Sequence, residues 1–393
     1  MKVTHVITEF YPALGGGPIA TFRRVKQLTK LGVENTVIAG NILNAWTNLK
    51  IEAGWDESDG VRILRLPATN FHSYYTIVRG IRRHLLDGDP DLVHLYGYGY
   101  YSTEICAMKL QGSPVPMVFS PCGYFPLTKD LSPLMKVIFE TFSRRNTLKR
   151  ANRIFVESDF EAGIFSRLAS YRKVAKVPGP VTSEDTFSRS FDPGEFRAKY
   201  GVRGDYFISI GRINVSKGFQ NIVKSIAEFN KLCPTKSTKF VIVGSDQGYV
   251  SKIQELAKHH GVENQIILIP NMPEEFKFSA LSGAVAFILP SFLEGYGGVV
   301  GEAMAVGTPI IVTKFGGAHE RIVSNQIGRV IDPTNSSEMA AALNWALDLS
   351  QVQRSDLKRA YQGVLREGHT VESSAKVALE HYRELVECYS NRR

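Results

Sequence analysis

The chain carries the sequence VTHVITEFYPALGGGPIATFRRVKQLTKLGVENTVIAG over residues 3–40. Its first apolar run predicts a buried strand at residues 3–9, which ends shortly before the glycine run Gly15–Gly17. Helical periodicity then covers residues 19–31, with a proline just before it and a glycine just past its end. Residues 33–39 predict a second strand. Strand, glycine turn, helix and strand in this order are typical of the beginning of a doubly wound α/β sheet.

The alternation of strands and helices continues on both sides of a proline-rich break. Before the break, strands are predicted at residues 61–66, 92–95, 115–120 and 153–157, and helices at residues 75–86 and 131–150. After it, strands are predicted at residues 206–210, 239–243, 266–269, 285–289 and 309–313, and helices at residues 219–230, 250–260, 276–281, 301–306, 338–349 and 352–366. The break itself predicts an interdomain linker, and it reads Val177-Pro178-Gly179-Pro180-Val181-Thr182-Ser183.

This order predicts an α/β fold with two Rossmann-like domains that face each other across a cleft. A length of 393 residues also exceeds what one hydrophobic core covers. We expect an N-terminal domain at residues 1–181 and a C-terminal domain at residues 182–370. The long amphipathic helix at about residues 371–393 is expected to join the N-terminal domain.

The composition is that of an ordinary globular protein, with 44% hydrophobic and 22% charged residues. No apolar run approaches the roughly 18 residues that span a bilayer, and the N-terminus lacks the features of a signal peptide. The four cysteines are far apart, which argues against a zinc site or a disulfide framework. We therefore expect a cytoplasmic protein.

The net charge of +9 lies almost entirely in the first half of the chain. Residues 1–181 hold 23 Lys and Arg against 15 Asp and Glu, a net charge of +8, and residues 182–393 hold 24 against 23, a net charge of +1. This excess favours an anionic partner, although no nucleic-acid motif is present. Residues 134–150 mix apolar side chains with a basic end, which favours peripheral binding to an anionic membrane. The competing interpretation is a core-facing helix with a solvated end.

The strongest chemical pattern is Glu294-Gly295-Tyr296-Gly297-Gly298-Val299-Val300-Gly301-Glu302. The glycine-rich turn lets a ligand approach the backbone, and the helix that follows offers unpaired N–H groups to an anion. Carboxylates are good acceptors for sugar hydroxyls, so both glutamates can face one ligand. The competing interpretation is a pair of solvated carboxylates at a helix start, stabilised by the helix dipole.

A second pattern follows a strand and precedes a helix, and it reads Gly211-Arg212-Ile213-Asn214-Val215-Ser216-Lys217-Gly218. Arg212 can hold two phosphate oxygens with its planar guanidinium, and Lys217 adds a compact charge. The residue order is not that of a P-loop. The spacing suits a pyrophosphate, and the competing interpretation is two surface charges.

In these motifs the chain resembles glycosyltransferase family 4, the glycosyl transferases group 1, which are retaining enzymes of GT-B fold. The resemblance extends over essentially the whole chain. The family patterns E-x7-E and G-R-x-x-x-x-K-G match the two motifs above. Further matches stand in order at strand ends, and they are Pro290-Ser291, the set Ala305, Gly307, Pro309 and Ile310, the set Gly316, Gly317 and Glu320, the loop Gly15–Gly17, and Asp91, Val93 and His94.

The resemblance implies a metal-independent hexosyltransferase with a nucleotide diphosphate sugar as donor, and no cofactor. A UDP-sugar is favoured over GDP-mannose, and the acceptor is expected to be a glycan or a lipid-linked intermediate of glycoconjugate or polysaccharide biosynthesis. Arg212 and Lys217 would hold the diphosphate, Glu294 would contact the transferred sugar, and Glu302 would bind the ribose. The other donor-side residues implied are Gly16, Gly17, Gly211, Gly244, Asn271, Met272, Tyr296, Gly297, Gly298 and Val299.

The chain departs from the family on the acceptor side. Many members have a His-Gly pair where this chain has Cys122 and Gly123, followed by Tyr124. A neutral thiol cannot replace an imidazole as a base. The acceptor-side candidates are therefore His94, Cys122, Gly123 and Tyr124, with a packed core residue as the competing interpretation for His94 and a small buried filler for Cys122.

Two further functions remain as alternatives. One is a nucleotide-sugar epimerase or hydrolase of the same fold, and the other is a non-catalytic protein that binds nucleotide sugars. A dinucleotide-binding dehydrogenase is disfavoured, because the glycine run is followed directly by proline and does not fit G-x-G-x-x-G.

Overall fold

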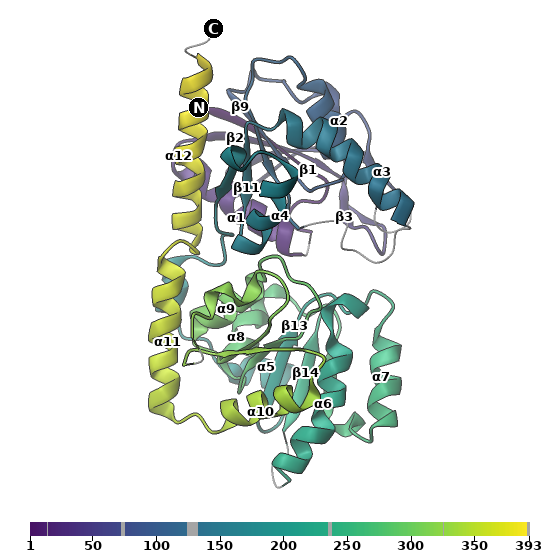
Figure 1. Ribbon diagram of the computed structural model, residues 1–393, viewed down its shortest axis with the longest axis vertical. Coiled ribbons are helices and arrows are strands. Elements are labelled where there is room, and N and C mark those ends of the chain that lie inside the picture. The colour runs from purple at the N-terminus through teal and green to yellow at the C-terminus, as the bar shows by residue number, and fades with distance from the viewer. Residues whose placement is uncertain (14, 72–74, 124–132, 235–237, 325, 391–393) are drawn as a thin grey trace. The chain divides into compact units, whose positions relative to one another are not determined.

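The computed structural model describes residues 1–13, 15–71, 75–123, 133–234, 238–324 and 326–390 (Figure 1). The chain divides into two compact units. Unit 1 consists of Met1–Pro180 together with Val371–Arg393, and unit 2 consists of Val181–Thr370. The chain therefore crosses between the units twice, once at the proline-rich segment and once before the last helix.

Unit 1 is built on an eight-stranded sheet whose neighbours are parallel except for one antiparallel pair at an edge. Across the sheet the strands are β12 (Val174–Lys176), β11 (Arg153–Val156), β10 (Met117–Ser120), β9 (Leu92–Tyr96), β1 (Lys2–Ile7), β2 (Glu34–Gly40), β6 (Val61–Leu66) and β5 (Gly54–Ser58). The order runs outward from β1 in one direction and from β9 in the other. This doubly wound topology confirms the predicted α/β class.

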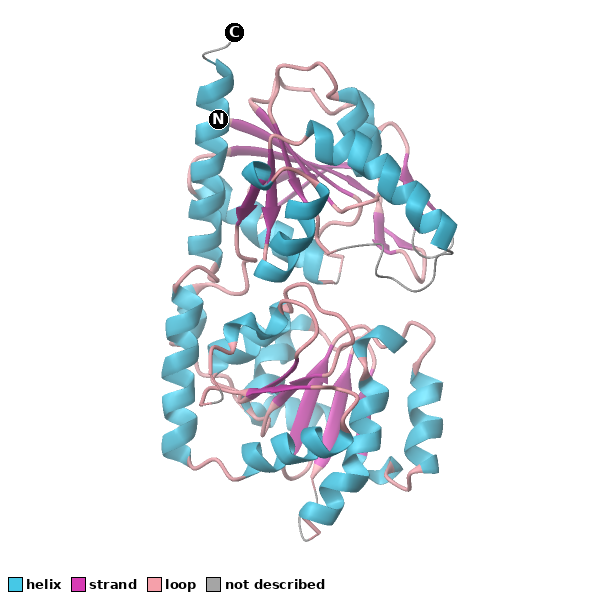
Figure 2. Cartoon of the chain, viewed as in Figure 1, coloured by secondary structure: helices cyan, strands magenta, loops and turns pink. Residues whose placement is uncertain are grey.

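Helices cover both faces of this sheet (Figure 2). They are α1 (Gly16–Lys30), α2 (Tyr101–Lys109), α3 (Pro133–Ser143) with a π-helix at Arg144–Leu148, α4 (Asp159–Leu168) and α12 (Val371–Ser390). Leu379 and Tyr382 of α12 share an apolar cluster with Leu28 of α1 and Val118 of β10. Because an amphipathic helix is stabilised mainly by the packing of its apolar face, this cluster accounts for the place of α12 in unit 1.

The helix predicted at residues 75–86 is wrong. These residues form β8 (Tyr75–Val78), which pairs antiparallel with β7 (Ala68–Phe71), and then a short 3-10 helix at Ile81–Arg83. β-Branched side chains at residues 76–78 favour a strand, and Gly80 interrupts the run with a φ of 79°. A second small antiparallel pair in unit 1 consists of β3 (Ile42–Asn44) and β4 (Leu49–Lys50).

Unit 2 is built on a six-stranded parallel sheet, also with helices on both faces. In sheet order the strands are β15 (Ile266–Ile269), β14 (Lys239–Val243), β13 (Tyr206–Ile210), β16 (Phe287–Leu289), β17 (Ile310–Thr313) and β18 (Arg329–Ile331). Its helices are α5 (Pro193–Tyr200), α6 (Phe219–Leu232), α7 (Val250–His259), α8 (Lys277–Ser282), α9 (Gly298–Val306), α10 (Ser336–Leu347) and α11 (Gln351–Arg366). The strand order reverses between β13 and β16, which are paired neighbours.

Alternate residues of the strands in unit 2 enter two separate cores. Ile208 and Val241 pack in the core that includes residues of α8, α9 and α11. Phe207 and Phe240 pack in the core that includes residues of α6, α7 and α10. Burial on both faces explains why these strands are nearly continuous apolar runs and could be predicted, whereas the three-residue edge strand β18 was not.

Candidate functional site

Two loops meet at the point where the strand order of unit 2 reverses. One loop covers residues 211–218 after β13, and the other covers residues 290–297 after β16. The amide of Phe292 donates a hydrogen bond to the carbonyl of Ser216 at 2.9 Å, so the loops are joined through their backbones. In open α/β sheets, ligands bind at such a reversal, outside the carboxyl ends of the strands.

A salt bridge also joins these loops through their side chains. Lys217 Nζ lies 2.5 Å from Glu294 Oε2, and Ser291 Oγ donates to the same carboxylate oxygen at 3.3 Å. The Lys217 and Glu294 side chains are each 17% exposed, so they are partly shielded from water and still reachable by a ligand. Arg212 lies exposed on the first loop. The structure thus brings together a cation and a carboxylate that the sequence supplied in separate motifs.

The first loop is held in shape by Asn214. Its Oδ1 accepts hydrogen bonds from the amide of Lys217 at 3.3 Å and from the hydroxyl of Ser216 at 2.8 Å. Its Nδ2 donates to Gln247 Oε1 at 2.7 Å, on the loop after β14. Asn214 therefore fixes the backbone that carries Lys217, and it does so in the way that asparagine side chains commonly organise turns.

The glycine turn before α9 is held by Arg321, which the sequence analysis missed. Arg321 Nη2 donates to the carbonyls of Tyr296 and Gly297, both at 2.7 Å, and its guanidinium lies 4.3 Å from the centroid of the Tyr296 ring. Since the C=O and N–H of a trans peptide point in opposite directions, the amides of Gly297 and Gly298 point away from Arg321. The N-terminus of α9 is therefore oriented by a buried cation, and amides at a helix start can bind an anion.

Gly316 lies directly against the backbone of Glu294. Its φ is 98°, and a Cβ built on it would lie 2.1 Å from the carbonyl oxygen of Glu294. The amide of Gly317 donates to that same oxygen at 2.8 Å. Gly316 and Gly317 therefore both hold the backbone of Glu294 in place, and a side chain would not fit at position 316.

We expect Gly316→Ala to lower the free energy of unfolding by about 1–3 kcal/mol or more. A side chain at this φ is strained, and its Cβ would also overlap the backbone of Glu294. Chemical denaturation of the purified full chain measures this change. Gly363→Ala in α11 is the matched control, because its Cβ would meet no atom within 4 Å, and it should stabilise the chain or change it by less than about 1 kcal/mol. Equal stability of Gly316→Ala and wild type would contradict the packing described.

Glu302 has a partner that the sequence did not indicate. Lys277 of α8 places its Nζ 2.8 Å from Glu302 Oε1 and also contacts Glu274. The Lys277 and Glu302 side chains are 7% and 5% exposed. The available sign was a lysine within the mostly apolar segment at residues 276–281, but no pattern in the sequence indicated its partner. A buried carboxylate needs such a counter-ion to remain ionised.

Other predicted donor-side residues of unit 2 follow neighbouring strands. Gly244 follows β14, and a Cβ on it would lie 1.8 Å from the carbonyl oxygen of Gly211. Asn271 follows β15, is exposed and has a φ of 55°. Met272 packs against the core of unit 2. The loops after β13, β14, β15 and β16 therefore all begin at the carboxyl ends of neighbouring parallel strands.

The predicted residues of unit 1 form a separate set. Gly16 and Gly17 lie in the first turn of α1, and a Cβ on either would meet no atom within 4 Å. Packing therefore does not require glycine at these two positions. Cys122 is exposed with a φ of 54°, and Gly123 follows it with a φ of 107°. Tyr124 lies outside the described residues.

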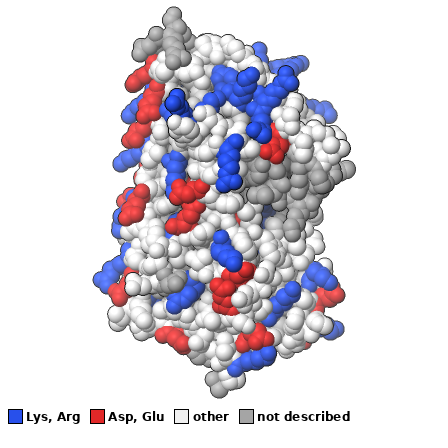
Figure 3. Space-filling view, in the orientation of Figure 1, with Lys and Arg blue, Asp and Glu red and all other residues white. Residues whose placement is uncertain are grey.

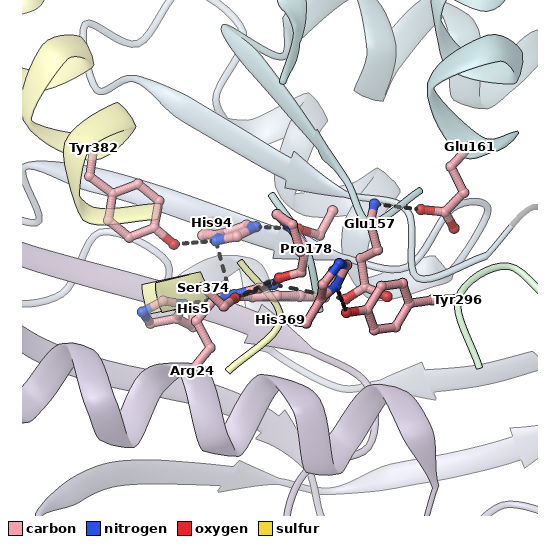
Figure 4. Close-up of polar contacts among 12 residues, drawn as sticks. His5, Arg24, His94, Glu157, Glu161, Pro178, Tyr296, His369, Ser374 and Tyr382 are labelled. Atoms are coloured by element: carbon pink, nitrogen blue, oxygen red, sulfur yellow. Dashed lines mark hydrogen bonds and ion pairs between the residues drawn. The ribbon is translucent and has the colours of Figure 1, made fainter. Parts of the chain in front are cut away.

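His94 lies in the core of unit 1, which favours the competing interpretation of a packed core residue over an acceptor-side position. His94 is 0% exposed, and its Nε2 lies 2.8 Å from Ser120 Oγ. Its Nδ1 lies 2.5 Å from the hydroxyl of Tyr382 (Figure 4) and 3.0 Å from that of Tyr96. Both ring nitrogens therefore have buried partners, and His94 links β9 to the last helix, α12.

A second histidine, His5 of β1, lies in the same buried network. Its Nε2 is 2.9 Å from Asn35 Oδ1, and its Nδ1 is 3.1 Å from the hydroxyl of Tyr96. Burial lowers the pKa of His5 to about 4, and the charge of Arg24 also lowers it. Burial likewise holds the pKa of His94 well below its usual value. Both imidazoles are therefore neutral in the folded chain.

The free energy of unfolding is expected to fall as the pH is lowered from 6.5 toward 4. In this window the unfolded chain binds a proton at His5 and the folded chain does not, so acidification favours unfolding. His5 alone should contribute about 3 kcal/mol across the window. Urea unfolding at a series of pH values measures the slope. His5→Gln should reduce it and His259→Gln, at an exposed position, should not; an unchanged slope in His5→Gln would refute the assignment.

Three further findings limit the chemistry of the described residues. They contain no group of three or more histidine, cysteine or acidic side chains placed to hold a metal ion. All four cysteines are free, with Cys106 and Cys233 buried and Cys122 and Cys388 exposed. Within the described part of the chain, no helix combines the length and the apolar character needed to cross a membrane.

Comparisons with known proteins agree with the motifs. The family model described as "Glycosyl transferase 4-like domain" matches residues 15–179, and the model described as "Glycosyl transferases group 1" matches residues 194–362. A D-inositol 3-phosphate glycosyltransferase from Paenarthrobacter aurescens (strain TC1) is 31% identical over 338 residues, which cover 82% of this chain and 79% of that relative.

Solved structures match both units together. Sucrose-phosphate synthase from Thermosynechococcus elongatus matches with a TM-score of 0.79 at 17% identity, covering 98% of this chain and 99% of that one. Anabaena HepE, solved in complex with UDP and glucose, matches with a TM-score of 0.78 at 15% identity, covering 98% of this chain and 100% of that one. At these identities the likeness concerns the fold, which is the GT-B fold of two Rossmann-like domains.

Proposed function

This chain belongs to the glycosyl transferases group 1 and is a glycosyltransferase, and we propose that it moves a hexosyl group from a nucleotide diphosphate sugar to a glycan or lipid-linked acceptor. We further propose that the transfer retains the anomeric configuration and needs no metal ion. The Lys217–Glu294 contact carries this proposal, because it places a cation and a carboxylate 2.5 Å apart at the reversal of strand order.

The electrostatics of the site suit the departure of a diphosphate. In the proposed reaction the bond from the anomeric carbon to the diphosphate oxygen breaks, and an acceptor hydroxyl oxygen bonds to the same face of that carbon. Negative charge grows on the leaving diphosphate, where Arg212, Lys217 and the N-terminus of α9 would stabilise it. The acceptor proton would pass to a diphosphate oxygen, so the step requires no strong protein base.

The salt bridge has a defined place in this scheme. Lys217 and Glu294 neutralise each other through their ion pair. When the donor binds, Lys217 would turn to a phosphate oxygen, and Glu294 would then accept hydrogen bonds from the hydroxyls of the transferred sugar. Glu302, held by Lys277, would accept from the ribose hydroxyls, and the base would lie near Gly244, Asn271 and Met272.

We propose a UDP-sugar as the donor, with GDP-mannose as the alternative. The acceptor would be an intermediate of polysaccharide or glycoconjugate biosynthesis, and the 31% identical relative adds D-inositol 3-phosphate to the acceptors worth testing. The enzyme would act in the cytoplasm, and peripherally at an anionic membrane surface when the acceptor is lipid-linked. Residues 134–150 would provide that contact.

Two assays on the purified full chain test the function. A thermal-shift panel of UDP, GDP, UDP-hexoses and GDP-mannose should show larger stabilisation by the uridine compounds, since a specific ligand stabilises the folded state by mass action. Transfer assays with the stabilising donor should then give product only with an acceptor present. Donor hydrolysis without transfer would support a hydrolase, and binding without turnover would support a non-catalytic protein; either result rejects the proposal.

A further inference from the structure

Helix α3 presents a row of exposed apolar side chains. Leu134, Val137, Ile138 and Phe142 are 70%, 60%, 52% and 45% exposed. Their spacing of three and four residues places them on one face of the helix. Single exposed apolar residues are ordinary, but several together on one helical face form a surface that a partner covers. These four side chains do not face the core, whereas Leu148, further along residues 134–150, packs in the core of unit 1.

A basic hollow adjoins the C-terminal end of this row. Its volume is about 520 Å³, and its lining includes Arg144, Arg145, Lys149 and Lys173 but no acidic residue. The Lys173 ammonium donates to the carbonyl of Lys149 at 2.8 Å, which fixes one cation at the wall. The segment that carries the first two cations is the π-helix, whose extra residue per turn changes which side chains face outward.

The hollow lacks internal neutralisation. Within the described residues, Arg144, Arg145 and Lys149 form no ion pair. Burial lowers the pKa of Lys173, and the charge of nearby Arg150 lowers it further. A bound anion would offset both the burial of Lys173 and its repulsion by Arg150. The hollow is therefore suited to a phosphate.

We propose that this face of unit 1 docks on an anionic phospholipid bilayer, with the apolar row of α3 among the acyl chains and a lipid phosphate in the hollow. A soluble phosphate compound or a nucleic acid would use the cations but leave the apolar row exposed, whereas a bilayer satisfies both at once. On the face of unit 1 seen in Figure 3, Lys and Arg side chains gather on the side of α2 and α3. The net charge of +8 over residues 1–181 adds long-range attraction to such a surface.

The proposal deepens the proposed function by naming where a lipid-linked acceptor would be met. Only the biological role of the docking rests on the proposed function. Binding to vesicles needs neither donor nor acceptor, so a failure of docking and a failure of transfer are measured independently.

Co-sedimentation of the full chain with vesicles tests the docking. We expect binding to phosphatidylcholine vesicles that contain phosphatidylglycerol, weak binding to phosphatidylcholine alone, and loss of binding as salt is added. Arg144→Gln/Arg145→Gln should weaken binding about thirtyfold, because each charge near the surface strengthens binding by about fivefold. The matched control Arg189→Gln/Arg203→Gln removes two exposed arginines from unit 2 and should leave binding unchanged.

A second pair of variants tests the apolar row. Leu134→Ser/Ile138→Ser should weaken binding about tenfold or more, because these side chains would no longer enter the bilayer. Val323→Ser/Val352→Ser, at positions 72% and 71% exposed in unit 2, is the matched control and should have no effect. Equal binding to neutral vesicles, no difference between a test pair and its control, or a dimer that Leu134→Ser/Ile138→Ser dissociates would each overturn the proposal.

Discussion

Replacing Lys217 by alanine is expected to lower kcat for transfer by about 100- to 1000-fold, the usual effect of removing one preorganised group that stabilises developing charge. Lys217 is the cation that the structure places beside Glu294, at 2.5 Å, where β13 and β16 reverse the strand order. Without it, the leaving diphosphate would lose a charge partner during bond breaking. Initial rates at saturating donor and acceptor measure the effect.

The control for this variant is Lys252→Ala. Lys252 forms an exposed ion pair with Glu255 in unit 2, at 2.9 Å, and lies outside the loops of the proposed site. Its removal takes away the same charge and should change kcat less than twofold, because the exposed Lys252–Glu255 pair belongs to neither loop of the proposed site. A kcat for Lys217→Ala within threefold of the wild-type value would reject Lys217 as a group that stabilises the leaving diphosphate.

Replacing Lys277 by methionine is expected to lower the free energy of unfolding by about 3–5 kcal/mol, because it removes the ammonium that pairs with the buried carboxylate of Glu302. The two side chains are 7% and 5% exposed and 2.8 Å apart. Methionine retains much of the lysine's length, so the loss of packing is small. Chemical denaturation gives the free energy directly.

The double variant Lys277→Met/Glu302→Gln separates the charge from the packing. It removes both charges, so much of the lost stability should return. Lys231→Met is the matched control, since Lys231 pairs with Glu228 on the surface, with side chains 71% and 40% exposed. It should change the free energy of unfolding by no more than about 0.5 kcal/mol. A Lys277→Met variant as stable as this control would contradict the buried pair.

The strands of unit 2 could be predicted because helices cover both faces of their sheet. A strand that is buried on both faces is a nearly continuous apolar run in the sequence. Lys217 and Glu294 could be predicted for a related reason. The chain leaves parallel strands at one edge of the sheet, so residues placed just after β13 and β16 are brought close by the topology alone.

Lys277 and Arg321 could not be predicted in the same way. Each acts through a partner on another segment, Glu302 on α9 for Lys277 and the carbonyls of the glycine turn for Arg321. A pattern along the chain shows that a carboxylate or a turn needs support, but it does not say which distant side chain supplies it. Buried pairing becomes visible only when the helices are placed in three dimensions.

His94 shows the limit of reasoning from a family motif. It lies between Val93 and Leu95 in a strand that is buried on both faces, so its position predicts a core residue. The error at residues 75–86 has another cause. The β-branched residues 76–78 favour a strand, and Gly80 favours a turn after it, but the segment was predicted as a helix.

A crystal structure of the full chain with bound UDP or a UDP-hexose tests the central claim most directly. The account predicts diphosphate oxygens within about 3 Å of the Lys217 ammonium and the Arg212 guanidinium, with the Lys217–Glu294 contact broken and the ribose hydroxyls at Glu302. Nucleotide bound away from the loops after β13 and β16, with Lys217 still paired to Glu294, would contradict it.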